Sequence, residues 1–256
     1  MNAGDFAIRW IGGSERTELH VGCEVRQYDT DWHFHQDWQV IHVTAAERIF
    51  EWRGGAATVR KGQTLILPPD FVHRGRNSER AASFIMLYVS PATVGISRAD
   101  SLTLLHDRTL AKTLTQAASE GSDPGWVKTI RSIFTGTRFR PAQRRTSIPT
   151  AVSRTKVWLE EHQNYLNCFE KLGAIGDCNP FYMSHLFRRW AGLSPRSFRL
   201  QIRLLEARRR ISQGQAIARV AADLGFADQS HLARQFKRAF GLTPGRYSCL
   251  SRPRID

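Results

Sequence analysis

A short segment that occurs twice in the C-terminal half of the chain limits its fold more than any other feature of the sequence. The two copies lie 49 residues apart and align without gaps, HLFRRWAGLSPRSF at 185–198 and RQFKRAFGLTPGRY at 234–247. Both keep an aromatic residue, two basic residues, Gly-Leu and a hydroxyl residue before proline. Repetition at a fixed offset is typical of a repeated structural unit. We therefore expect two similar units in this half.

The residues after 150 have the apolar spacing of helices. Ser194 and Thr243 each precede a proline, and a hydroxyl N-cap before proline at the first helical position begins a helix. Asp228 is placed to cap the helix that follows it. The expected helices are Ala151–His162, Phe169–Ile175, Pro180–Ala191, Pro195–Gln213, Ile217–Leu224, Gln229–Phe240 and a short one from Pro244.

A short helix and a tight turn are expected before each copy of the repeat. In the second copy, Ala221 allows two helices to cross closely and Gly225 supplies the left-handed backbone of the turn. In the first copy the turn is Asp177-Cys178, with Gly176 one position early, and aspartate tolerates the left-handed conformation better than most residues. The pattern predicts two helix-turn-helix units. A helical repeat without a role in DNA binding is the alternative.

Basic residues are concentrated in the same half of the chain. Residues 141–256 contain 20 Lys and Arg against 8 Asp and Glu, whereas residues 1–140 contain 17 against 15, and the net charge is +14. Such an excess favours a polyanionic partner. Charge alone leaves nucleic acid, an anionic membrane and a merely cationic surface open, but the arginines in both copies of the repeat favour DNA.

Residues 150–248 resemble the DNA-binding domain of the AraC/XylS family of bacterial transcription regulators. The segment at 224–247, LGFADQSHLARQFKRAFGLTPGRY, follows the signature of that family. The resemblance implies two helix-turn-helix subdomains joined by one long helix, here Pro195–Gln213, with recognition helices in successive major grooves of promoter DNA. It also implies an effector-responsive activator of a nearby operon that acts with RNA polymerase in the cytoplasm, at the nucleoid.

The resemblance also assigns roles to single residues. The base-facing positions of the two recognition helices fall on Phe181, Ser184, His185, Gln229, Ser230, His231 and Arg234. Arg234 has the groups to bind guanine and Gln229 those to bind adenine. Phosphate contacts, which position a protein without specifying sequence, are expected from Arg188, Arg189, Lys237 and Arg238. Core positions are expected at Leu186, Phe187, Leu232, Phe236 and Phe240.

The first 90 residues have the pattern of short strands separated by turns. β-prone runs alternate with Gly54-Gly55, Lys61-Gly62, Pro68-Pro69-Asp70 and Asn77-Ser78. Many short antiparallel strands at this spacing predict a small barrel or sandwich. The expected strands are Val21–Gln27, Gln39–Thr44, Arg48–Trp52, Ala57–Arg60, Thr64–Leu67 and Ser83–Val89.

Helical spacing returns after Pro91 and predicts two more helices. One includes Leu102, Leu105, Leu110 and Leu114, and the other Trp126, Ile130, Ile133 and Phe134. These segments, within residues 101–135, either cover their own domain or form the seam of a homodimer. Residues 141–150, rich in proline, arginine and threonine, are expected to be a linker. The expected domains are an all-β, cupin-like barrel with following helices at 1–140 and an all-α domain of two helix-turn-helix subdomains at 151–256.

Two histidine motifs lie in the first domain. His33 and His35 belong to WHFHQDW at 32–38, and a second motif, G-x5-P-x-D-x2-H-x3-N, runs from Gly62 through His73 to Asn77. They resemble the two cupin motifs and the sensing domain that precedes AraC-type DNA-binding domains. In metal cupins a glutamate joins three histidines. Here that position carries Gln39 or a nearby residue, which should weaken a divalent site.

The interpretation we favour is a pocket that binds a small effector, or none, without a metal or other cofactor. Tryptophan rings would form apolar walls, and the histidines would orient the effector through hydrogen bonds. For any single tryptophan, ordinary core is the more typical place. The residues of the expected pocket are Trp32, His33, His35, Trp38, Trp52 and His73.

Other classes of protein fit this sequence less well. A metal-dependent cupin enzyme would need a fourth ligand and further acid–base residues, so no catalytic residue is expected. A DNA-repair methyl acceptor would need four N-terminal cysteines, and residues 1–140 contain only Cys23. The scattered cysteines are expected as free thiols in a reducing cytoplasm. No apolar run suits a membrane helix, and MNAGDFAIRW is unlike a secretory signal, so no membrane partner is expected.

Overall fold

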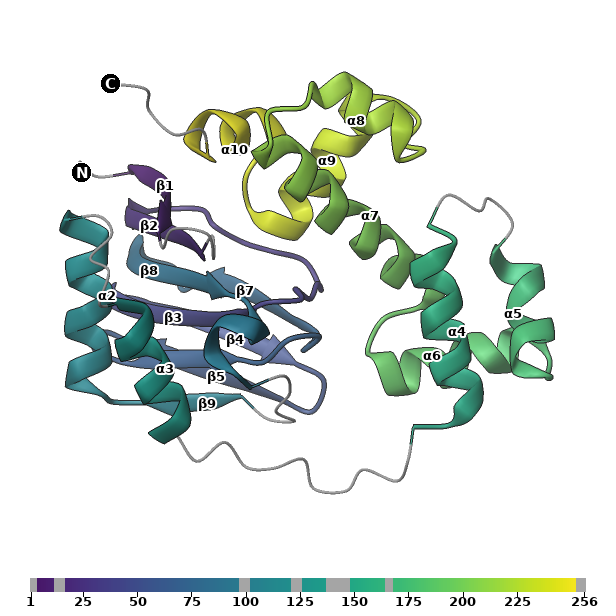
Figure 1. Cartoon of the computed structure of the whole chain (residues 1–256), viewed down its shortest axis with the longest axis horizontal. Helices are drawn as coiled ribbons and strands as arrows, with labels where there is room; N and C mark the ends of the chain where they lie inside the picture. The colour runs from purple at the N-terminus through teal and green to yellow at the C-terminus, as the bar shows by residue number, and fades with distance from the viewer. Residues whose placement is uncertain are drawn as a thin grey trace. The chain divides into compact units, whose positions relative to one another are not determined.

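The computed structural model describes residues 4–11, 17–96, 102–120, 126–136, 148–163 and 168–251. Contacts divide the chain into a β-rich unit, residues 1–143 with 249–256, and a helical unit, residues 144–248. Figure 1 labels most elements of both. The strands come first in the chain and most of the helices follow them. This order confirms the fold class predicted from the sequence. No described helix has the length and apolar character needed to cross a membrane.

Antiparallel strands form two sheets in the β-rich unit. The larger sheet has the order β1-β2-β8-β3-β6-β9 and the smaller one β5-β4-β7. Their inner faces meet, because the Arg48 guanidinium of β4 lies over the Phe84 ring of β8 at 4.5 Å. The strands are β1 (Phe6–Ile11), β2 (Thr17–Val25), β3 (Trp38–Ala45), β4 (Glu47–Trp52), β5 (Gly55–Arg60), β6 (Thr64–Leu67), β7 (His73–Asn77), β8 (Ala82–Val89) and β9 (Thr103–Leu105).

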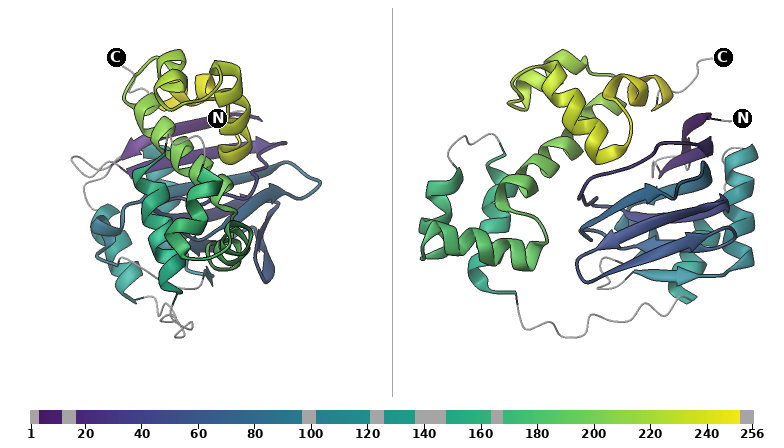
Figure 2. Two further views of the ribbon diagram at one scale, coloured as in Figure 1. Left: turned by 90° about the vertical axis from the view of Figure 1, so that its right-hand side faces the viewer. Right: turned by 180° about the vertical axis from the view of Figure 1, so that it is seen from behind.

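Side chains alternate along β3 between the two faces of the larger sheet. Trp38 and Val40 belong to an apolar cluster with residues of α2 (Arg108–Glu120) and α3 (Trp126–Gly136). Gln39, between them, faces inward and donates a hydrogen bond to Tyr88. Successive side chains of a strand point to opposite faces of its sheet, so β3 contacts the helices on one face and the interior between the sheets on the other. Figures 1 and 2 show both helices beside the larger sheet. The short α1 (Pro91–Val94) precedes them in the chain.

Three strands are not predicted by the hydrophobic pattern. β7 reads HRGRN, and its buried positions are His73, Gly75 and Asn77, none of which is a large apolar residue. β1 and β9 also have no counterpart among the expected strands. The alternation rule finds strands with an apolar inner face, so a strand with a polar buried face escapes it.

The helix expected to include Leu102 and Leu105 is wrong at its beginning. Thr103–Leu105 pairs with β6 as strand β9, and α2 begins only at Arg108. Asp107 marks the change, because its carboxylate accepts a hydrogen bond from Leu110 N at 2.9 Å. Such a cap fixes the start of a helix more firmly than leucine spacing does.

The helical unit follows its predicted elements closely. Ser194 accepts a hydrogen bond from Ser197 N and Thr243 one from Arg246 N, both at 3.2 Å, while Asp228 caps α9. The expected caps are thus confirmed. The helices are α4 (Thr150–Glu161), α5 (Cys168–Gly176), α6 (Pro180–Ala191), α7 (Pro195–Ser212), α8 (Ile217–Asp223), α9 (Gln229–Phe240) and α10 (Pro244–Ser251).

Candidate functional site

Equivalent hydrogen bonds close the turns of the two helix-turn-helix units, α5–α6 and α8–α9. Cys178 N donates to Gly173 O at 3.0 Å, and Phe226 N donates to Ala221 O at 2.9 Å. A bond from a backbone N–H to the carbonyl five residues earlier ends a helix sharply and redirects the chain. The first helix of each unit therefore ends in the same way.

A left-handed residue lies in each turn, immediately before the N–H donor. Asp177 has a φ of 51° and Gly225 a φ of 67°, so the expected left-handed conformation of Asp177 is confirmed. These two residues are 48 positions apart, but the N-caps that follow, Asn179 and Asp228, are 49 apart. The first turn is therefore one residue shorter than the second.

The shorter turn is packed closely against the helix before it. A Cβ on Gly173 would lie 2.8 Å from the carbonyl oxygen of Cys178, and one on Gly176 would lie 2.6 Å from Met183 Sδ. The second turn accommodates Ala221 at the place of Gly173. Gly176 is the last residue of α5, where the missing side chain lets α6 approach.

Helix α6 presents aromatic and basic side chains to solvent. Phe181 is 72% exposed, whereas Met183 and Phe187 are fully buried, and Leu186, expected in the core, is half-buried. Tyr182, which the sequence did not assign to the site, is 61% exposed in the same first turn. A second aromatic residue beside Phe181 at a helix start was the signal for it. The other predicted residues on this helix are half-buried Ser184 and exposed His185, Arg188 and Arg189.

Helix α9 separates a buried apolar face from an exposed polar one. Leu232 and Phe236 are fully buried, as expected, and Phe240 is half-buried. Gly241 ends the helix in the left-handed conformation, as Gly192 does for α6. The predicted contact residues that lie exposed on α9 are Gln229, Ser230, Arg234, Lys237 and Arg238.

His231 has a different environment from the other predicted base contacts. Its ring is half-buried, edge-on to Phe226 at 5.5 Å, and Nδ1 accepts a hydrogen bond from Ala227 N at 3.4 Å. Side chains at this helical position commonly bond back to the backbone before the helix. In the structure the His231 side chain therefore packs against the turn that precedes α9.

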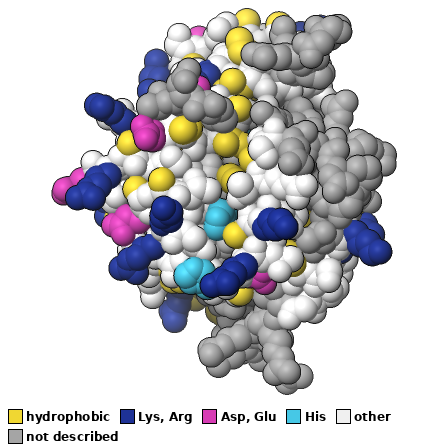
Figure 3. All heavy atoms as spheres, turned by 90° about the vertical axis from the view of Figure 1, so that its left-hand side faces the viewer, with side chains coloured by type: hydrophobic (Ala, Val, Ile, Leu, Met, Phe, Trp, Pro, Cys, Tyr) yellow, Lys and Arg dark blue, Asp and Glu magenta, His cyan; other side chains and the backbone are white. Residues whose placement is uncertain are grey.

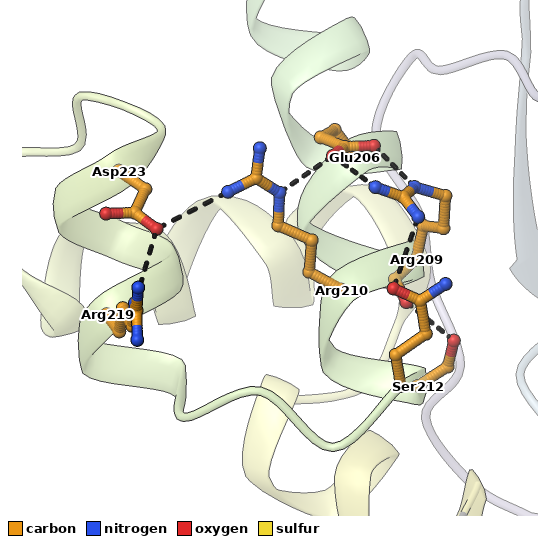
Figure 4. A network of polar contacts seen from close by, with 7 residues as sticks. Glu206, Arg209, Arg210, Ser212, Arg219 and Asp223 are labelled. Carbon is orange, nitrogen blue, oxygen red and sulfur yellow. Dashed lines mark hydrogen bonds and ion pairs between the residues drawn. The ribbon is translucent and has the colours of Figure 1, made fainter.

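Ion pairs connect α7 to α8, the helix before α9. Glu206 accepts hydrogen bonds of 2.7 Å from both Arg209 and Arg210, and Arg210 also lies 3.4 Å from Asp223 of α8 (Figure 4). Arg219 approaches the same Asp223 carboxylate at 3.8 Å. Hydrogen bonds from Arg209, and then from Arg210, lower the pKa of Glu206 from 4.5 to about 2. The network helps to fix α8 on the connecting helix.

The three histidines of the two sequence motifs meet inside the β-rich unit. His33, His35 and His73 are buried, and their ligand nitrogens lie within 4.8 Å of one another. His33 and His73 exchange backbone hydrogen bonds of 2.9 Å, and Asp70 N donates to His35 O at 2.9 Å. Burial, and then the neighbouring His33 and His35, lower the pKa of His73 well below its ordinary value. His73 is therefore neutral at pH 7.

The remaining positions of the second motif shape the backbone around the cluster. Gly62 and Asp70 both have left-handed conformations, with φ of 84° and 62°. Asn77 accepts a hydrogen bond from buried Arg48 at 2.6 Å and donates one to Val25 O at 2.6 Å. Local folding therefore explains Gly62, Asp70 and Asn77. His73 is the residue of this motif whose side chain lies in the buried cluster.

Trp38 lies away from the histidines that it was expected to accompany. Its ring packs edge-on to Phe134 of α3 at 5.1 Å, and Nε1 donates to Ile96 O at 2.8 Å. The reason is the alternation of β3, which turns Trp38 toward the helices and Gln39 toward the interior. Trp38 belongs to the apolar core and not to a pocket wall around the cluster.

The other two tryptophans differ in their relation to the cluster. Trp52 pairs with His73 across β4 and β7, and its half-buried ring lies 6.3 Å from Phe71. Trp32 is 41% exposed, with the Arg74 guanidinium over its ring at 5.0 Å. Of the three, Trp52 is therefore best placed to border a ligand near the histidines.

A separate surface pocket of about 430 Å³ lies in the β-rich unit, and none of the expected effector residues lines it. Burial lowers the pKa of His42 in this pocket, so its imidazole is neutral at pH 7. Figure 3 shows histidine side chains among Lys and Arg on one face of the molecule. The pocket is lined by His42, Gly62, His106, Asp107, Arg108 and Ala111.

Comparison with known proteins gives two family models in the order of the two units. The AraC-like ligand binding domain matches residues 22–123, and a helix-turn-helix domain matches residues 174–248. The histidine cluster lies within the first match, and α6 and α9 lie within the second.

Relatives and solved structures agree with this order. The HTH-type transcriptional activator RhaS of Pectobacterium carotovorum is 38% identical over 58 residues, 22% of this chain and only 21% of RhaS. The HTH-type transcriptional regulator YobQ of Bacillus subtilis is 25% identical over 243 residues, 88% of this chain and 92% of YobQ. ToxT of Vibrio cholerae with a bound unsaturated fatty acid has the same fold, with a TM-score of 0.61 at 12% identity over 98% of each chain.

Three observations converge on one family: the repeated segment, the two turns closed by equivalent hydrogen bonds, and the order of the matched domains. This chain belongs to the AraC/XylS family of transcription regulators.

Proposed function

We propose that this protein binds double-stranded promoter DNA sequence-specifically through α6 and α9, and that it acts by binding and not by catalysis. The observation that carries the proposal is the pair of helices with matching caps and turns, joined by α7. Each helix buries an apolar face and exposes polar, aromatic or basic side chains. Two such helices in one compact unit suit successive major grooves of DNA.

Exposure and chemistry support the role of single side chains on α9. Arg234 carries two N–H groups that match O6 and N7 of guanine, and the Gln229 amide matches adenine. Both side chains are exposed. Lys237 and Arg238, one turn later, are proposed to contact phosphates.

The first recognition helix is proposed to make a more apolar contact. Phe181 has the highest exposure among the large apolar side chains described, and an aromatic ring can contact the methyl group of thymine. His185 is proposed to contact a base edge beside it, with half-buried Ser184 reaching less far. The basic pair Arg188 and Arg189 would contact phosphates.

The β-rich unit is proposed to sense a small effector. A relative is named as a transcriptional activator, and the ToxT structure holds an unsaturated fatty acid, which together support an effector-responsive activator. We propose that the protein activates a nearby operon with RNA polymerase, in the cytoplasm at the nucleoid. The domain boundaries 1–140, 141–150 and 151–256 are part of the same proposal.

A homodimer through residues 101–135 is a separate proposal. Leu110, Leu114, Ile130 and Phe134 are all buried in the apolar cluster beneath their own sheet. This packing supports the alternative, in which the two helices cover their own domain. A dimer would then have to use the outer faces of α2 and α3, and sedimentation over a range of concentrations would detect it.

Selection of bound DNA from a random library tests the proposed function. The purified full chain should enrich a sequence with two conserved elements about one helical turn apart, roughly 10 base pairs. Enrichment of one element only would mean that a single helix reads DNA. No enrichment above that of a denatured control would contradict the proposal.

A further inference from the structure

Helix α7 carries more positive charge than its single acidic residue can neutralise. Its sequence, PRSFRLQIRLLEARRRIS, contains six arginines and one glutamate. That glutamate, Glu206, accepts hydrogen bonds of 2.7 Å from Arg209 and from Arg210. Among the residues that the structure describes, no acidic side chain pairs with Arg199 or Arg203. The earlier turns of α7 therefore hold two cations outside the ion-pair network.

The guanidinium groups of Arg199 and Arg203 are partly withdrawn from water. Both side chains are half-buried, and Nη1 of Arg199 and Nε and Nη2 of Arg203 are buried without a hydrogen-bond partner. Arg203 follows Arg199 by one helical turn, so both project from one face of α7. Burial, and then the charge of Arg199, lower the pKa of Arg203. Because a buried cation without acceptors costs free energy, an anion that reached both groups would stabilise them.

The pair lies beside the start of α9. The Arg203 guanidinium lies over the ring of Phe226, in the turn between α8 and α9, at 4.3 Å. The same ring contacts His231 edge-on at 5.5 Å, in the first turn of α9. Phe226 thereby holds the guanidinium near the end of α9 where Gln229 and Ser230 are exposed. Figures 1 and 2 show α7 running from this region to the α5–α6 unit.

A phosphate group of DNA suits this position. Arginine presents its N–H groups in a planar fork that matches the oxygens of a phosphate. When α6 and α9 occupy successive major grooves, the stretch of DNA between the grooves faces the helix that joins them. A backbone phosphate in this stretch would bring oxygen acceptors and a negative charge to both arginines at once.

We propose that Arg199 and Arg203 bind one phosphate of the DNA backbone, between the segments that α6 and α9 contact. This inference rests on the proposed function and adds a contact from the connecting helix to it. Because the pair belongs to α7, its phosphate contact fixes the register of the helical unit on DNA. It carries no sequence preference of its own.

Replacement of single phosphates in the selected DNA site by neutral methylphosphonate tests the contact. For the wild-type full chain, one replacement between the two conserved elements should weaken binding by about tenfold, because a charged hydrogen-bonded pair is lost. A double variant, Arg199→Gln with Arg203→Gln, should lose less than about twofold at the same replacement, because its contact is already missing. Its slope of log affinity against log salt should also fall by about one.

Two further variants separate the contact from net charge and from folding. Arg154→Gln is the charge-matched control, because Arg154 is an exposed arginine of α4. This variant should keep the full loss at the replaced phosphate. Arg199→Gln alone leaves the contact between Arg203 and Phe226 in place and removes one of two like charges. It should bind the unmodified site more weakly, by about threefold or more, with no fall in melting temperature.

The possible failures are distinguishable. Equal losses for the wild type and the double variant at every replaced phosphate would overturn this proposal and leave DNA binding by α6 and α9 standing. Disappearance of the loss in Arg154→Gln would also overturn it, because the effect would then come from net charge. A full chain that enriches no DNA sequence would overturn both this proposal and the proposed function.

Discussion

The two helix-turn-helix units differ most at a single position of the turn. Gly225 holds a left-handed conformation at no steric cost, whereas Asp177 holds the same conformation with a side chain attached. The second turn is also one residue longer and accepts Ala221, where the first has Gly173. The first unit therefore stores more local strain than the second.

Replacement of Asp177 by glycine should stabilise the helical unit. Relief of the left-handed strain is worth about 0.5–1 kcal/mol, because aspartate is among the residues that tolerate this conformation best. Urea unfolding followed by circular dichroism gives the free energy of unfolding. The matched change Gly225→Ala should cost about 1 kcal/mol. A less stable Asp177→Gly variant would mean that the aspartate side chain makes a necessary contact.

Replacement of Gly173 by alanine should destabilise the first unit. The new Cβ would meet the carbonyl oxygen of Cys178 at 2.8 Å, and backbone moves less readily than the end of a side chain. The expected cost is about 1–3 kcal/mol in unfolding free energy. Gly245→Ala is the control, because open space surrounds that glycine. Equal stability of the two variants would contradict the close packing of the first turn.

At the scale of elements, α7 acts as the common support of both units. Its Glu206 joins Arg209 and Arg210 on the same helix and, through Arg210, Asp223 on α8. A shift of α8 relative to α7 would move α9, which follows it after a short turn. The network thereby helps to set the orientation of α9.

The low pKa of Glu206 predicts the pH dependence of this support. The pKa is about 2 in the folded protein, against an ordinary 4.5. A lowered carboxyl pKa adds stability that is fully present above pH 4.5 and is lost as the pH falls through 2. Thermal unfolding between pH 5 and pH 2 should therefore decline more steeply for the wild type than for Glu206→Gln. Parallel curves would show that the ion pairs add nothing to stability.

The elements that the sequence predicts well are those fixed by local signals. Ser194, Asp228 and Thr243 cap their helices as expected, because a cap depends on a few neighbouring residues. The leucine spacing predicts a helix where strand β9 lies, because the pairing of β9 with β6 is a contact between residues distant in the sequence. The polar strand β7 likewise owes its position to pairing with β4.

The candidate site likewise has some features that follow from local sequence and others that depend on tertiary contacts. The exposed face of α9 follows from its helical period, whereas the place of His231 in the turn depends on its contact with Phe226. The two histidine motifs name the members of the buried cluster, but the backbone carbonyl oxygen beside each Nδ1 is seen only in the structure. Trp38 was misplaced because spacing alone does not show which face of a strand turns inward.

At the scale of the whole molecule, the chain combines a β-rich unit with a buried histidine cluster and a helical unit with two helix-turn-helix units. The sequence repeat explains the second unit. It provides the same glycine C-cap twice, Gly192 and Gly241, and it places basic residues in the last turns of both α6 and α9. The central claim is that these helices read DNA.

Binding of two α9 variants to the selected DNA site, over a range of salt concentrations, tests that claim most directly. Arg234→Ala should cost about 1–3 kcal/mol on this site and relax the preference at one base position. Lys237→Ala should weaken binding to all sequences alike and lower the slope of log affinity against log salt by about one. Binding by both variants with wild-type affinity and salt dependence would show that α9 does not contact DNA as claimed.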